Sequence, residues 1–171
     1  MEGTFSSTWA STNGANSDSG LGADPSVPER SARLLVFVVA DRRCACEITA
    51  VREIVAWRSV TRLPGAPASV AGLINLRGSI VTVLDLGVHL GGAPANRTTG
   101  SIVIAESGGK SVGLAVDALH DVCRVPVADI EAAEAERFSE TGNEIVRGVL
   151  RAGDEMAVML DLGRIIASVL A

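Results

Sequence analysis

The sequence predicts a mainly-β protein built from two similar small barrels. Short runs of apolar and β-branched residues, each bounded by turn residues, recur along the 171-residue chain and are typical of β-strands. A repeat relates the first half of the chain to the second half. Short strands that repeat in this way favour closed barrels, because closure leaves no sheet edge exposed.

The repeat becomes visible when the chain is laid over itself with two offsets. An offset of 68 places residues 34–36 on 102–104 and residues 51–54 on 119–122. An offset of 76 places Gly72 on Gly148 and residues 84–87, Leu-Asp-Leu-Gly, on the identical residues 160–163. Each unit is expected to contain a hairpin, a third strand, a segment that starts with glycine, and a strand that ends in this tetrapeptide.

The repeat also separates residues by expected role. Residues kept in both units are expected to build the fold, whereas residues that differ are candidates for a task of one unit. Asn75 falls on Arg151 and Arg77 falls on Gly153, so the run Asn-Leu-Arg-Gly occurs once. This difference favours Arg77, which interrupts the least polar part of the chain, as a functional residue.

The strands follow one another in a simple order. Residues 33–40 form a continuous apolar run that predicts a buried strand, and residues 41–43 form the turn to a second strand at 44–48. The third follows, with Val51, Val55 and Ile54 toward the core and Arg52 and Glu53 outward. A short helix is expected over residues 68–74. Further strands are predicted at residues 80–86, 101–106, 111–116, 119–125, 145–151 and 156–160.

The ends of the chain and its loops differ from these strands in composition. Residues 1–31 are rich in Ser, Gly, Ala and Asn and predict a flexible tail, so the folded domain is expected over residues 32–171. Residues 91–100 form a polar loop, and residues 129–142 an acidic one with one helical turn at most. Asp161 is expected to cap a C-terminal helix that runs through Leu170, and Asp85 occupies the matching position in the first unit.

Composition and charge exclude several classes of function. A net charge of −5 argues against a nucleic-acid partner, which would need a basic surface. The chain has no apolar run approaching the ~20 residues that span a bilayer and no signal-peptide pattern at its start, so a cytosolic protein without membrane insertion is expected. Cys44, Cys46 and Cys123 lack the spacing of a zinc site and are expected to be buried hydrophobic residues.

The sequence contains no recognisable catalytic constellation. The two histidines, His89 and His120, lie in no metal or nucleophile motif, and the segment 107–110 is too short for a phosphate-binding loop. We therefore expect no enzymatic activity, no metal and no cofactor, and we interpret the chain as a binding module. Glu53 and Arg77 are the natural charged pair at the rim of an apolar groove for a partner helix; alternatively, they form a salt bridge with each other.

The segment 72–86, Gly-Leu-Ile-Asn-Leu-Arg-Gly-Ser-Ile-Val-Thr-Val-Leu-Asp-Leu, resembles the signature of the CheW family of chemotaxis coupling proteins. Residues 51–54, 112–117, 121–122 and 156–162 support the resemblance, which covers residues 33–170. It implies a pair of five-stranded, SH3-like β-barrels around a shared core. No receiver domain follows in this sequence, so the resemblance implies the single-domain type of coupling protein rather than the two-domain CheV type.

The resemblance implies an adaptor that bridges the cytoplasmic domain of a chemoreceptor, a methyl-accepting protein, to the regulatory domain of a CheA-type histidine kinase. Its location would be the cytoplasm, at membrane-associated receptor arrays. The positions that match those of the family for receptor binding are Val51, Glu53, Gly72 and Arg77, and Asn75 joins them because the run that contains it occurs once. The alternative is a CheW-like scaffold in another pathway, such as pilus motility or developmental signalling, without a classical chemoreceptor.

Overall fold

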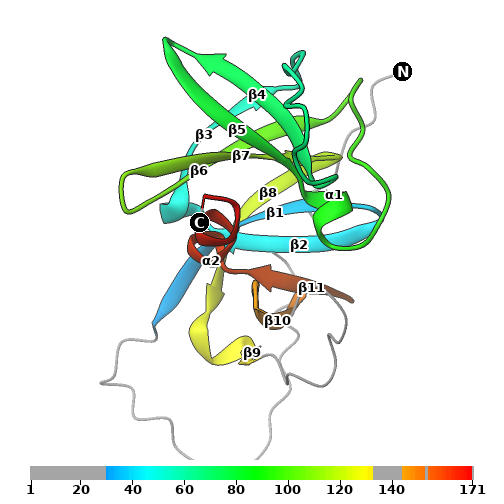
Figure 1. Ribbon diagram of the computed structural model, residues 1–171. Helices are drawn as coiled ribbons and strands as arrows, with labels where there is room; N and C mark the ends of the chain where they lie inside the picture. Colours follow the sequence, from blue (N-terminus) through cyan, green and yellow to red (C-terminus); the bar gives the residue numbers. More distant parts are fainter. Residues whose placement is uncertain (1–29, 133–143, 153, 171) are drawn as a thin grey trace, which may run out of the picture.

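The structure is a computed structural model that describes residues 30–132, 144–152 and 154–170. The predicted tail lies outside the described residues except for Arg30 and Ser31, as does most of the predicted acidic loop. The described chain forms two β-sheets, one above the other in Figure 1, with the helix α2 (Leu162–Val169) beside the junction between them. The mainly-β class predicted from the sequence is confirmed.

The lower sheet has the strand order β8-β1-β2-β11-β10-β9. Its strands are β1 (Ser31–Val39), β2 (Arg42–Glu47), β8 (Ala118–Pro126), β9 (Ile130–Ala132), β10 (Val146–Ala152) and β11 (Glu155–Leu160).

The upper sheet has the order β3-β6-β7-β5-β4. Its strands are β3 (Val51–Ala56), β4 (Val70–Leu76), β5 (Ser79–Asp85), β6 (Ser101–Ser107) and β7 (Lys110–Val116). Three short helical turns lie between strands: η1 (Ile48–Ala50) connects the lower sheet to the upper one, α1 (Leu86–His89) connects β5 to β6 within the upper sheet, and η2 (Val127–Asp129) connects β8 to β9 within the lower sheet.

The two repeat units exchange their hairpins. The hairpin β1–β2 of the first unit pairs with β8 and β11 of the second, and the hairpin β6–β7 of the second pairs with β3 and β5 of the first. When each strand is replaced by its repeat partner, the order β8-β1-β2-β11-β10 becomes β3-β6-β7-β5-β4, which is the order of the other sheet. Neither half of the chain therefore forms a barrel from its own strands alone.

Both sheets close into barrels because the chain that leaves one edge strand pairs with the strand at the opposite edge. Beyond β3, the amide of Thr61 donates to the carbonyl of Leu73 on β4, and the amide of Leu73 donates to Thr61, both at 2.8 Å. This bridge joins the chain that leaves one edge of the upper sheet to its other edge. In the lower sheet, β8 leads through η2 into β9, which pairs with β10.

The core explains why the first strand reads as a continuous apolar run. Leu34 and Val36 point into the interior of the lower barrel, whereas Leu35, Phe37 and Val39 point into the core that both sheets share. A strand buried on both faces has no room for polar alternation. Cys44 and Cys46 lie in the shared core, where burial raises the pKa of each thiol to about 12, so the prediction that they are buried hydrophobic residues is confirmed.

Two elements differ from the sequence-based prediction. The helix expected over residues 68–74 is wrong, because this segment pairs with β5 as the strand β4. On β3, Ile54 is exposed and Glu53 is half-buried on the side of Val55, so the expected inward and outward faces are also wrong for these two residues. In a strand, successive side chains alternate between faces, and Ile54 cannot share a face with Val55.

The two repeated aspartates cap helices, as predicted. The amide of Val88 donates to Oδ1 of Asp85 at 3.2 Å at the start of α1, and the amide of Arg164 donates to Oδ1 of Asp161 at 3.0 Å at the start of α2. Asp85 is fully buried and also accepts from the amide of Ala95, at 3.0 and 3.2 Å. The first unit therefore uses its capping aspartate to fix a loop as well.

This difference predicts unequal costs for the two caps. We expect Asp85→Ala to lower the free energy of unfolding by about 2–3 kcal/mol, because it leaves the buried amide of Ala95 and the half-buried amide of Val88 unpaired. Asp161→Ala, the matched control, loses an exposed cap worth about 1 kcal/mol. Urea denaturation of both variants measures the difference, and equal losses would contradict the additional role of Asp85.

Candidate functional site

The hairpin between β4 and β5 turns through Arg77 and Gly78. Leu76 pairs with Ser79, so the loop has two residues, and both have positive φ, 50° for Arg77 and 88° for Gly78. Two-residue loops of this kind favour Asn-Gly, since a residue with a long side chain is strained there. The amide of Gly78 donates to Oδ1 of Asn75 at 2.8 Å, which stabilises the turn from the side chain of the predicted site residue.

An ion pair holds the side chain of Arg77 over the upper barrel. Its Nη1 and Nη2 donate to Oε1 and Oε2 of Glu53, on β3, at 3.0 and 2.8 Å. The Arg77 side chain is 73% exposed and that of Glu53 18% exposed. An exposed pair contributes only ~0–1 kcal/mol to stability. Its main effect is therefore to fix the position of a guanidinium group whose outer face stays in solvent.

A groove of about 430 Å³ lies beside this ion pair. Glu53, Arg77 and Leu76 line it from β3 and the β4–β5 hairpin, and Glu106 and Ser111 line it from β6 and β7. Ile80, at the start of β5, also lines the groove and is 65% exposed. The groove thus combines an exposed apolar side chain with fixed charges, which suits the docking of another protein.

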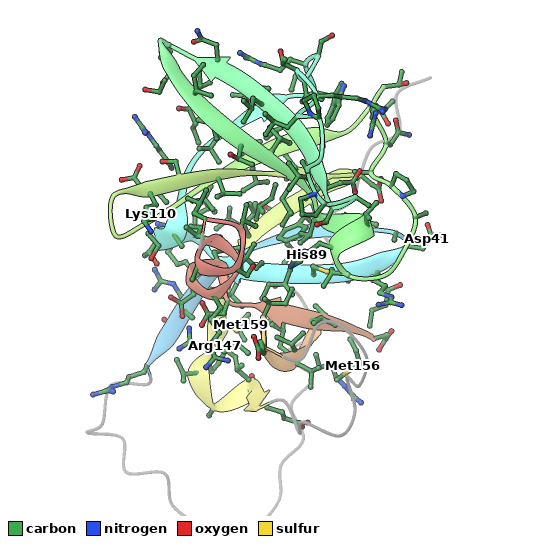
Figure 2. All side chains as sticks on the ribbon, viewed as in Figure 1. Asp41, His89, Lys110, Arg147, Met156 and Met159 are labelled. Carbon is green, nitrogen blue, oxygen red and sulfur yellow. The ribbon has the colours of Figure 1, made fainter. Side chains whose placement is uncertain are left out.

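A second hollow continues the first along β3. It has a volume of about 440 Å³, is lined by Val51 and by the turn of the β6–β7 hairpin, and shares Arg52 and Glu106 with the first. Figure 2 labels Lys110, at the tip of this hairpin. We call the two hollows together the β3 groove.

The structure brings together most of the residues expected from the sequence. Glu53 and Arg77 line the β3 groove and bind each other, which is the alternative pairing that the sequence left open. Val51 lines the second hollow, and Asn75 supports the turn. Gly72 does not line the groove; it lies in β4 against the backbone of Thr61.

The sequence did not predict other residues of the groove, among them Arg52, Ile80 and Glu106. The signal for Ile80 was present, because alternation along β5 places Val81 and Val83 inside and Ile80 and Thr82 on the other face. Arg52 and Glu106 gave no such signal, since their proximity depends on the pairing of two strands from different repeat units.

Asp117 and His89 are two titratable residues outside the groove. Oδ2 of Asp117 accepts from the amide of Ala40 at 2.7 Å, and Oδ1 accepts from the amide of Asn96 at 2.6 Å, so this carboxylate ties the β1–β2 turn to the loop before β6. His89 is half-buried at the end of α1, where burial lowers its pKa. Within residues 30–132, 144–152 and 154–170, no group of three or more His, Cys, Asp or Glu is placed to hold a metal ion.

Two exchanged barrels that present an open groove of apolar and paired charged residues define a protein-interaction module. The CheW-like domain family matches residues 33–170. The chemotaxis protein CheW of Rhizobium meliloti is 35% identical over 136 residues, which cover 79% of this chain and 87% of that protein. The chain therefore belongs to the CheW-like family.

Other relatives agree with this assignment. The chemotaxis protein CheW of Klebsiella aerogenes is 29% identical over 136 residues, covering 78% of this chain and 81% of that protein. The crystal structure of the scaffolding protein TtCheW from Thermoanaerobacter tengcongensis superposes with a TM-score of 0.69 at 30% identity, covering 77% of this chain and 90% of that one. In the described part of the chain, no helix has the length and apolar character needed to cross a membrane.

Proposed function

We propose that the chain is a non-catalytic adaptor that couples the cytoplasmic tip of a chemoreceptor to a CheA-type histidine kinase. The observation that carries this proposal is the fixed position of Arg77 at the rim of the β3 groove, beside the exposed Ile80. The relatives named above are chemotaxis or scaffolding proteins, which supports chemosensory coupling over a scaffold in another pathway.

The groove suits the tip of a helical hairpin. Such a tip presents apolar side chains along one face, with charged side chains beside them. One apolar side chain covers Ile80, and an acidic side chain meets the solvent-facing side of the Arg77 guanidinium. The apolar contact supplies affinity, and the charge fixes the orientation of the helix.

The kinase needs a different surface, because an adaptor has to hold both partners at once. We propose that its regulatory domain binds at the barrel ends, away from the β3 groove. An adaptor of this kind works in the cytoplasm, where the receptor tips lie, and needs no cofactor.

Co-sedimentation tests the proposal. Membranes that contain a chemoreceptor are mixed with the purified chain and with the regulatory domain of a CheA-type kinase. We expect the chain to sediment with the membranes and the kinase domain to sediment only when the chain is present. A chain that sediments with neither partner would overturn the proposed function.

A further inference from the structure

The strand β3 contains a bulge at Arg52. Val51 pairs with Ala105 and Glu53 pairs with the next residue of β6, Ile104. Arg52 is therefore an extra residue in β3 that has no partner in β6. In a regular strand, Arg52 and Glu53 would point to opposite faces. A bulge redirects side chains, and here both residues line the first hollow of the β3 groove.

The bulge lets Arg52 form an ion pair at the middle of the groove. Its Nη1 lies 3.3 Å from Oε2 of Glu106 on β6, and the hydroxyl of Ser111 donates to the same oxygen at 3.3 Å. Arg52 and Glu106 line both hollows, so the pair stands where the two hollows meet. A partner that lies along the whole groove has to cover it.

The second repeat unit shows that the barrel does not require this pair. The same bulge recurs on β8, where Leu119 pairs with Phe37 and Val122 with Leu35. The residues that correspond to Arg52 and Glu106, at an offset of 68, are His120 and Val38, which cannot form an ion pair of this kind. The bulge is therefore present in both repeat units, whereas the charged pair is present only at the bulge of β3.

We propose that the Arg52–Glu106 pair determines which receptor tips the β3 groove accepts. A receptor helix that crosses both hollows places an acidic side chain over Arg52 and a basic side chain over Glu106, so the order of charges along the helix sets its register and direction. This inference rests on the proposed function and names two specificity-determining residues of the same site. Arg77 fixes the position of one end of the receptor helix, and the Arg52–Glu106 pair recognises the charged side chains at its middle.

A charge swap distinguishes a role of the Arg52–Glu106 pair in receptor recognition from a role in the stability of the fold. Arg52→Glu and Glu106→Arg each break the pair, and the double variant restores it with reversed polarity. We expect each single variant to bind a receptor cytoplasmic fragment about tenfold more weakly, because one charge is then covered without its partner. The double variant is expected to melt like the wild type and yet remain about tenfold weaker, because the order of charges is reversed.

The pair Glu47–Arg147 in the lower sheet supplies a matched control. Its atoms lie 2.6 Å apart, and its side chains are 39% and 54% exposed, close to 44% and 54% for Glu106 and Arg52. Figure 2 shows Arg147 among the lower strands, away from the β6–β7 hairpin. Swapping the charges of this pair is expected to leave the affinity for the receptor fragment unchanged.

Two results would overturn the inference. One is full recovery of binding in the double variant, which would make the pair a structural contact only. The other is unchanged binding in both single variants. In either case, wild-type binding that is lost in Arg77→Glu would leave the proposed function intact, whereas failure of the wild type to bind any receptor fragment would overturn the function itself.

Discussion

Arg77→Glu is expected to weaken binding to a receptor cytoplasmic fragment by about 100-fold or more and to leave the thermal melt nearly unchanged. Reversing a charge that a partner covers typically costs several kcal/mol of binding energy, and each 1.4 kcal/mol is a factor of ten. The folded state loses only one exposed ion pair and gains a repulsion with Glu53, together about 1 kcal/mol. Co-sedimentation and a thermal melt of the same preparation measure both effects.

Arg77→Asn makes this test independent of stability. Asparagine is favoured at the first position of a two-residue loop with positive φ, so this variant is expected to be at least as stable as the wild type. It still loses the guanidinium and therefore the binding. Arg147→Glu breaks an ion pair outside the groove and is expected to bind normally. Normal receptor binding by a folded Arg77→Glu variant would contradict the proposed site.

The strain at Arg77 is itself an argument for function. A long side chain with φ of 50° occupies a position where asparagine or glycine fits more easily, and no buried contact requires arginine there. The other hairpin turn with non-glycine residues at positive φ is held differently, since the amide of Ala40 donates to Asp117. Positions that break a local rule without stabilising the fold are typical of functional sites.

The sequence predicted the parts of the site that depend on local patterns. The repeat singled out Asn75 and Arg77, because the run that contains them has no counterpart in the second unit. The repeated Leu-Asp-Leu-Gly segments predicted the caps at Asp85 and Asp161, and both form. These features depend on residues close together in the chain, so a single sequence contains them.

The missed features depend on pairing between distant strands. The helix predicted over residues 68–74 is wrong because this segment pairs with β5 and with Thr61, and neither pairing is visible in the local sequence. The exchange of hairpins is not visible in the sequence, because either pairing of the two units satisfies the same apolar pattern. The bulge at Arg52 likewise exists only relative to β6, and with it the proximity of Arg52 to Glu106.

The exchange of hairpins has a consequence for the groove. Glu53 and Arg77 come from the first repeat unit, whereas Glu106 and Ser111 come from the hairpin that the second unit contributes. The groove therefore exists only when the two units have folded together. A change that loosens one barrel is expected to affect the groove only if it displaces the strands that line it.

Gly72 and Gly148 allow this expectation to be tested with substitutions that meet a similar steric clash, and Gly72 has in addition a positive φ of 151°. A Cβ at Gly72 would lie 2.4 Å from the carbonyl oxygen of Thr61, and a Cβ at Gly148 would lie 2.4 Å from that of Glu131. Both oxygens belong to backbone that closes a barrel, so moving either one would disrupt the hydrogen bonds of that closure. We expect Gly72→Ala and Gly148→Ala each to lower the free energy of unfolding by about 3 kcal/mol or more.

The two glycine variants are expected to differ in their affinity for the receptor fragment. Gly72 lies in β4, the strand that carries Asn75 and the turn with Arg77, so Gly72→Ala shifts the rim of the groove. Gly148 lies in β10, which lines neither hollow. At a temperature where both remain folded, and with concentrations corrected for the folded fraction, Gly72→Ala is expected to bind the receptor fragment less tightly and Gly148→Ala to bind like the wild type.

A third glycine distinguishes a steric clash from backbone strain. Gly91 has a positive φ of 75°, but a Cβ there meets no atom within 4 Å. Gly91→Ala is therefore expected to cost only about 1 kcal/mol of stability and no receptor affinity. If Gly72→Ala were no less stable than Gly91→Ala, the contact with Thr61 would not close the upper barrel. Equal affinities of Gly72→Ala and Gly148→Ala would instead show that the position of β4 does not set the geometry of the groove.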